Sequence, residues 1–121
     1  MAIDNLIRGD HRLLTCTVTD ATGTPIDITN DVITLTIKSV ATDLDSTAAY
    51  QRAILATGGD ALVGIVKFQL SDTDTSLAIA SYQYDFQWER FGSGAGEVIT
   101  LERGTVSVVQ DITLDTGITP T

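Results

Sequence analysis

Apolar and polar side chains alternate along several stretches of this chain, most clearly at YQYDFQWE, residues 82–89. Four aromatic residues occupy the even positions there, and polar residues occupy the odd ones. Because successive side chains of a β-strand point to opposite faces, the pattern predicts a strand with an aromatic face and a polar face. The polar residues require water, so we expect the aromatic face to lie in the core.

The same alternation recurs in RLLTCTVT at 12–19, VITLTIK at 32–38 and LVGIVKFQL at 62–70. Frequent Val, Ile and Thr favours strands over helices. In the third stretch Gly64 marks an expected bulge, and one face is expected to carry Leu62, Val66, Phe68 and Leu70.

The end of the chain, VITLERGTVSVVQDITL at 98–114, predicts two short strands on either side of Gly104, which would permit a tight turn. ATDLDSTAAYQRAI at 41–54 fits either a short helix or a loop. We expect a loop that leads into a strand from Tyr50.

Turn residues separate these strands at DATGTP (20–25), TGGD (57–60) and GSGAG (92–96). After the third stretch, Ser71 or Asp72 can cap a helix and Asp74 favours its positive end, which predicts one or two helical turns near 72–80. A helical turn just before a Tyr-rich strand is typical of immunoglobulin-like sandwiches, where a Tyr hydroxyl bonds to upstream backbone, and Tyr82 is the candidate.

About seven short strands with turns every 8–12 residues predict an all-β fold, a single immunoglobulin-like β-sandwich of antiparallel strands. The 121 residues, 43% of them hydrophobic, suit one domain with its own core. We expect the sandwich to span 1–114 and residues 115–121 to form a flexible tail.

Charge and targeting signals narrow the function classes. Sixteen acidic residues against 7 basic ones give a net charge of -9, which disfavours nucleic acid as a partner because the few cations are scattered singly. Its first residues do not show the basic-then-apolar pattern of a signal peptide, and no apolar run reaches membrane-spanning length. We therefore expect a soluble protein that is made and kept, or assembled, inside a cell, with no membrane partner.

The sequence shows no catalytic, cofactor or metal constellation. His11 is the single histidine, and Cys16, the single cysteine, alternates with Leu14 and Val18 as a small buried residue would. One cysteine also excludes an intrachain disulfide, and one His with one Cys is too few for a zinc site. We expect no catalytic residues, no metal, no cofactor and no enzyme activity.

Four motifs have functional readings that we weigh against structural ones. The aromatic row could bind sugars or bases if it were exposed. The pairs Asp43 with Asp45 and Asp72 with Asp74 could bind calcium, but both lack the rest of an EF-hand. Arg8–Asp10 spells the integrin-binding tripeptide, which recurs by chance. GSGAG resembles a phosphate loop, yet a strand follows it where a helix is needed.

Three stretches of the chain, taken together, form a recognisable series of motifs: LIRGDHRLLTCTVTDATGTPIDIT, VKFQLSDTDTSLAIASYQYDFQW and ITLERGTVSVVQDIT. In order and spacing, from Leu6 to about Thr113, they resemble the N-terminal immunoglobulin-like domain of phage baseplate upper proteins and related tailed-phage virion proteins. The resemblance implies a sandwich that serves as an assembly module, forming rings or trimers in a tail or baseplate. That family continues into helical and C-terminal parts that are missing here, so a small free-standing virion protein or another tail or neck component is also expected.

The leading hypothesis is a non-enzymatic structural protein of a phage or prophage virion, assembled in the bacterial host cytoplasm. It would form a homo-oligomer and contact other virion proteins through sheet edges or loops. The alternative is a binding module for carbohydrate or a cell-surface partner, which would require Trp88 and Phe91 to be exposed. An enzyme that uses His11 is the third hypothesis.

Overall fold

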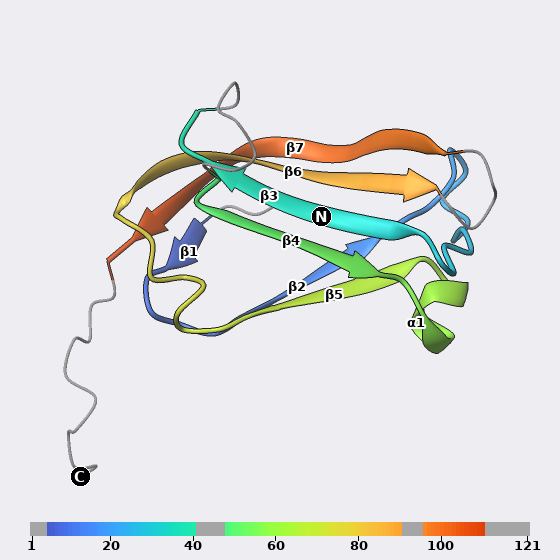
Figure 1. The fold of residues 1–121 in the computed structure, drawn as a ribbon, viewed down its shortest axis with the longest axis horizontal. Coiled ribbons are helices and arrows are strands. Elements are labelled where there is room, and N and C mark those ends of the chain that lie inside the picture. The colour runs from blue at the N-terminus through green and yellow to red at the C-terminus, as the bar shows by residue number, and fades with distance from the viewer. Residues whose placement is uncertain (1–4, 41–47, 91–95, 111–121) are drawn as a thin grey trace, which may run out of the picture.

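The computed structural model describes residues 5–40, 48–90 and 96–110. Within these residues the chain forms seven strands and one short helix (Figure 1). In chain order these are β1 (Asn5–Ile7), β2 (Arg12–Thr17), β3 (Val32–Lys38), β4 (Tyr50–Leu55), α1 (Gly58–Leu62), β5 (Ile65–Leu70), β6 (Ala80–Arg90) and β7 (Glu97–Val109). The predicted strand from Tyr50 is confirmed.

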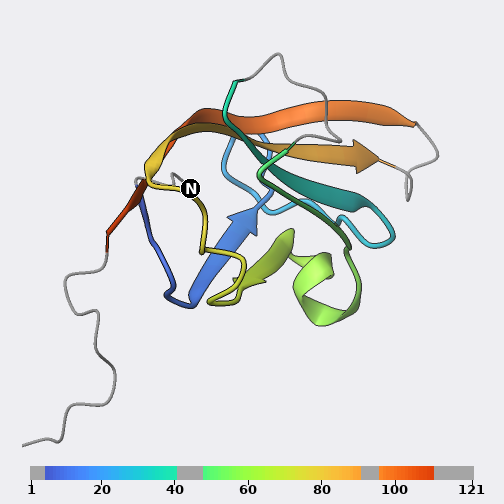
Figure 2. The same cartoon turned by 60° about the vertical axis from the view of Figure 1, so that its left-hand side comes forward.

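The described strands form two sheets that face each other, as predicted for an all-β sandwich. The larger sheet has the order β1-β7-β6-β3-β4, and β2 pairs with β5 in the smaller one. Figures 1 and 2 show the β2–β5 pair beneath the larger sheet. One detail of the prediction is wrong: β1 runs parallel to β7, whereas the other pairs are antiparallel. This position buries Leu6, the one buried residue of a three-residue strand.

The core lies between the two sheets and includes the aromatic row of β6. The even-numbered side chains from Tyr82 to Trp88 are all buried, which confirms the inward aromatic face. Phe68 of the smaller sheet meets Phe86 edge to face, with ring centroids 5.6 Å apart. Alternate apolar residues of the predicted strands at 12–19 and 32–38 are also buried: Leu14, Cys16, Val18, Ile33, Leu35 and Ile37.

Of the one or two helical turns predicted near 72–80, a single capped turn forms, in which the Thr75 amide donates to the Ser71 carbonyl at 3.2 Å, and no helix follows it. The Ser71 amide donates to Asp74 Oδ2 at 2.9 Å, and the Asp74 amide donates to Ser71 Oγ at 3.1 Å. They close a single turn, which ends because buried Thr75 bonds across to the β1–β2 turn. Further along, the Tyr82 hydroxyl donates to the Ala78 carbonyl at 2.6 Å, so the predicted corner bond is present.

The helix that does form is α1, where the TGGD segment predicted a turn. Ala61 turns inward and is fully buried, whereas Leu62 is 59% exposed and does not share a face with Val66, Phe68 and Leu70. Gly64 has a φ of +75° directly after the helix, and a Cβ there would lie 2.4 Å from the Val18 carbonyl oxygen. Gly64 is therefore a point of close backbone approach rather than a bulge in β5.

The prediction of two strands around Gly104 is also wrong, because β7 runs unbroken from Glu97 to Val109. Gly104 lies opposite Tyr84, and a Cβ at Gly104 would lie 3.1 Å from the Tyr84 ring. The glycine makes room for an aromatic ring within the sheet instead of turning the chain. The shift in register falls elsewhere, between Phe86 and Gln87.

The segment 111–121 lies outside the described residues, so the predicted end of the sandwich at 114 and the tail at 115–121 stay predictions. No helix within the described residues is long and apolar enough to cross a membrane.

Candidate functional site

The outer face of the larger sheet carries a polar groove with a volume of about 610 Å³. It crosses four strands, because the side chains that alternate with the core residues of β3, β4, β6 and β7 all reach this face. Its lining includes Thr34, Thr36, Gln51, Asp85, Gln87 and Arg103. The polar half of the β6 pattern therefore builds a hollow surface.

Hydroxyl, amide and charged groups meet within this groove. Gln51 Nε2 donates to Thr36 Oγ1 at 3.0 Å across the β3–β4 pair. The register places Arg103 of β7 directly opposite Asp85 of β6. The lining thus offers hydrogen-bond donors and acceptors to a polar ligand or a polar protein surface.

A second surface is the outer edge of β4. Among the described strands β4 ends the larger sheet, and its six residues pair one to one with β3. In an antiparallel pair every second residue directs its N–H and C=O away from the neighbour, so β4 has backbone groups directed outward along its length. Arg52 Nη1 donates to the Gln69 carbonyl of β5 at 3.4 Å, which directs the guanidinium toward the other sheet.

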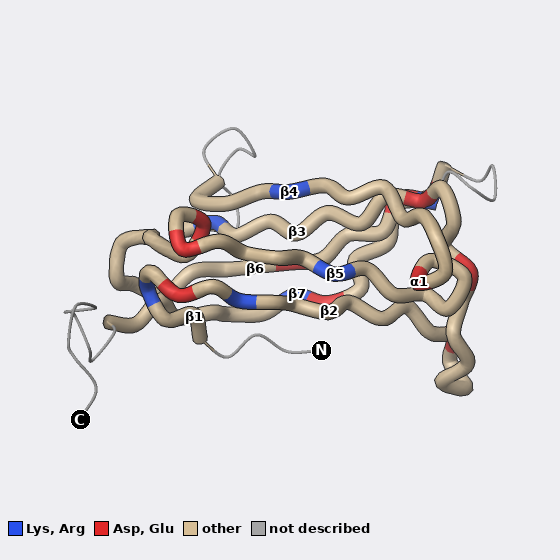
Figure 3. Tube along the Cα trace, turned by 90° about the horizontal axis from the view of Figure 1, so that it is seen from below, with Lys and Arg blue, Asp and Glu red and all other residues tan. Residues whose placement is uncertain are grey.

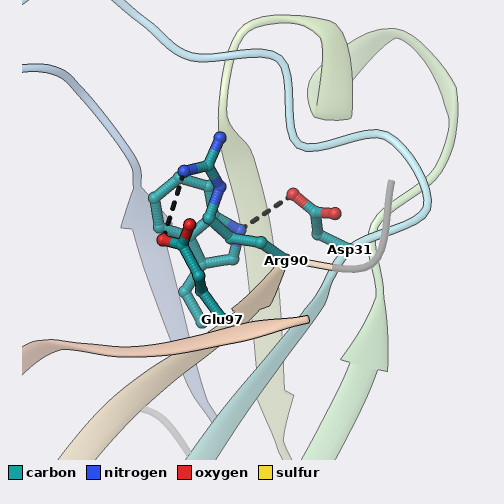
Figure 4. Close-up of polar contacts among 4 residues, drawn as sticks. Asp31, Arg90 and Glu97 are labelled. Atoms are coloured by element: carbon teal, nitrogen blue, oxygen red, sulfur yellow. Dashed lines mark hydrogen bonds and ion pairs between the residues drawn. The ribbon is translucent and has the colours of Figure 1, made fainter. Parts of the chain in front are cut away.

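A polar cluster closes the end of the aromatic row, with a buried Asp31–Trp88 pair beside a more exposed Arg90–Glu97 pair (Figure 4). Trp88 Nε1 donates to Asp31 Oδ2 at 2.9 Å, and the two residues are 5% and 3% exposed. The Arg90 guanidinium lies 4.9 Å from the Trp88 ring centre, and Arg90 Nη1 lies 3.5 Å from Glu97 Oε2. Trp88 is therefore part of the core, and the exposed aromatic platform that the carbohydrate hypothesis required does not include it.

Asp31 is the residue of this cluster that the sequence analysis missed. It precedes β3 and is separated from Trp88 by 57 positions, so no local pattern joins the two. Its backbone also helps to hold the site, since its carbonyl accepts from the Ala56 amide at 2.8 Å. A single Asp before an apolar strand is an ordinary turn signal, so its sequence context gave no indication of a buried role.

The two residues considered for catalysis differ in burial: Cys16 is buried and His11 is exposed. Cys16 is buried, and burial raises the pKa of its thiol to about 11, so the thiol is a poor nucleophile at neutral pH, as predicted. His11 is exposed in front of β2. Within the described residues no three His, Cys, Asp or Glu side chains come together as a metal site would require.

The Arg8–Asp10 tripeptide forms the turn between β1 and β2. Gly9 takes a φ of +87°, and its amide donates to Thr75 Oγ1 at 3.1 Å. The Thr75 hydroxyl donates to the Asp10 carbonyl at 2.7 Å, and Arg8 Nε donates to the Leu77 carbonyl at 3.0 Å. The tripeptide therefore fastens this turn to residues 71–77, which is a structural role.

The other motifs are divided between described and undescribed residues. The amides of Ser71 and Thr73 donate to the carboxylates of Asp74 and Asp72, so this pair caps a turn. Asp43, Asp45, Phe91 and residues 92–95 of GSGAG lie outside the described residues.

Comparison with known proteins places the fold. No protein-family model and no curated protein matches the chain. Among solved structures, the N-terminal domain of phage TP901-1 ORF48 is similar, with a TM-score of 0.54 and 13% sequence identity over 88% of this chain and 84% of that one. At this identity the likeness shows a shared fold: the chain has the fold of a domain from a phage protein.

Proposed function

We propose that this chain is a non-enzymatic structural module of a phage or prophage virion, in the tail, baseplate or neck. The observation that carries the proposal is the fold shared with the N-terminal domain of a phage protein over most of both chains. The order of motifs along the sequence supports it independently, since that order resembles the N-terminal domain of phage baseplate upper proteins.

The surfaces described above suit a module that works through contacts. The sealed core makes a stiff body, and an open sheet edge offers backbone groups to a neighbour. Exposed apolar side chains, among them Leu55 and Val98, add area that a protein contact would bury. We propose that copies associate with each other and with other virion proteins, and that assembly takes place in the host cytoplasm.

Tagging the chain in the genome that encodes it tests this function. Particles would be induced, purified on a density gradient and analysed by quantitative mass spectrometry. The proposal expects the tagged chain in the particle band at a constant ratio to the major tail protein. Recovery of the chain only from the particle-free fraction would refute it.

The polar groove favours one further candidate, a binding module for a carbohydrate. Sugars are held by hydrogen bonds from side chains of the kind that line the groove, although binding would lack stacking on Trp88. A glycan array of bacterial surface polysaccharides would test this reading. Binding that is lost in Gln87→Ala, inside the groove, and kept in Gln69→Ala, on β5, would support it. An array without binding would exclude it.

A further inference from the structure

Within the described residues, the edge of β4 lacks the proline, acidic side chain or bulge by which natural sheets block an added strand. Its sequence, YQRAIL, contains no proline and no acidic residue, and it pairs one to one with β3, without a bulge to twist it away. Its one charge, Arg52, is directed toward the Gln69 carbonyl of the other sheet. An extended segment could therefore pair with the outward backbone groups of β4.

The strands around this edge carry only basic charges, although two acidic residues lie nearby, Asp60 beside Lys67 and Asp74 near Tyr50. The three strands nearest to the edge, β3, β4 and β5, carry Lys38, Arg52 and Lys67 and no Asp or Glu, in a chain whose net charge is -9. Figure 3 shows the basic positions on β4 and β5, whereas acidic positions lie on β6 and β7 and in the connections at the ends of the strands. The ion pair of Lys67 with Asp60, at 3.7 Å, is exposed and therefore weak.

The charges on these strands distinguish two possible occupants of the edge, a second copy of this chain and a segment of another protein. A second copy that paired its own β4 here would bring one Arg52 near the other and join two chains of net charge -9. A segment that carries carboxylates would instead meet local positive charge. Charge complementarity therefore favours an acidic segment of a different protein.

We propose that β4 accepts an extended acidic segment of another protein, which adds a strand to the larger sheet with a carboxylate near Arg52. This inference rests on the proposed function, since it names the surface through which the module would meet a partner. Backbone pairing would supply the affinity, and the carboxylate near Arg52 would supply the selectivity.

Two matched peptides test the proposal, an acidic one (Thr-Val-Glu-Val-Glu-Val-Thr) and a basic one with Lys in place of Glu, both with blocked termini. Each is titrated into the ¹⁵N-labelled chain while amide shifts and hydrogen exchange are followed by NMR. The acidic peptide should shift the β4 resonances and slow the exchange of every second β4 amide, because only alternate amides face outward. The basic peptide should do neither.

Variants of equal charge change separate the edge from general electrostatics. Arg52→Glu should weaken the acidic peptide about tenfold and allow the basic peptide to bind, whereas Arg12→Glu, on β2, should leave both titrations unchanged. Well-dispersed spectra of both variants confirm folding.

Three results would overturn the inference. Equal shifts from both peptides would remove the charge argument, and shifts on β6 without β4 would move the site to the groove. Broadening of β4 signals with protein concentration alone would place a second copy on the edge. Any of these results combined with recovery of the chain in purified particles would leave the proposed function standing.

Discussion

Gly64 is the position where one added methyl group should cost this fold most. Its φ of +75° is strained for any other residue, and a Cβ would lie 2.4 Å from the Val18 carbonyl oxygen and 2.9 Å from that of Ile26. Both neighbours are backbone, and the Val18 amide already donates to the Gly64 carbonyl at 2.8 Å. A positive φ costs an alanine about 1–2 kcal/mol, and forced separation of packed backbone adds about 1–3 kcal/mol. We expect Gly64→Ala to destabilise the chain by about 2–5 kcal/mol.

Gly23→Ala is the matched control, because Gly23 has a φ of +84° and no atom within 4 Å of an added Cβ. It should cost only the conformational term of about 1–2 kcal/mol. The assay is urea unfolding of both variants, followed by the fluorescence of Trp88, the chain's single tryptophan. If the two variants differ by less than about 0.5 kcal/mol, the crowding argument at Gly64 is wrong.

Three other changes check separate parts of the structure. Tyr82→Phe removes the 2.6 Å bond to the Ala78 carbonyl and should cost about 1–2 kcal/mol in urea unfolding; a variant as stable as the wild type would contradict the corner. The Cys16 thiol, with its pKa raised to about 11, should react with Ellman's reagent at pH ~8 only after unfolding; rapid labelling of the native chain would show that the thiol is accessible. Hydrogen bonds from the Thr22 hydroxyl and the Thr24 and Thr22 amides lower the pKa of Asp20 below 3.8. The ionised carboxylate therefore stabilises the folded state at pH values above the unfolded pKa of Asp20. This stabilisation is lost as the pH falls through the folded pKa. Thr22→Ala should raise the Asp20 midpoint in a ¹³C NMR titration, and an unchanged midpoint would refute this cause.

The alternation of side chains predicted the core well because it records which face of each strand meets water. The inward row from Tyr82 to Trp88 follows from that rule alone. The errors arose where a contact with a residue distant in sequence determines the local structure. Gly104 looked like a turn residue, but it lies within β7, where an added Cβ would crowd the Tyr84 ring of the neighbouring strand. The capped turn after Ser71 does not extend into a helix because Thr75 is held by the β1–β2 turn.

The candidate site was less accessible to sequence reasoning. The polar side chains of β6 were visible, but the groove needs the order of four strands, which no local pattern contains. The same order makes β4 an edge and brings Arg52 to the Gln69 carbonyl of β5. The Asp31–Trp88 hydrogen bond joins residues 57 positions apart, so no local sequence pattern could predict it.

We propose above that this chain is a structural part of a phage particle. Electron microscopy of purified particles that carry the epitope-tagged chain, decorated with gold-labelled antibody, tests it most directly. The account expects gold at one fixed position on the tail, baseplate or neck of most particles. Gold distributed no differently from that on untagged particles, with the tagged protein present in the lysate, would contradict it.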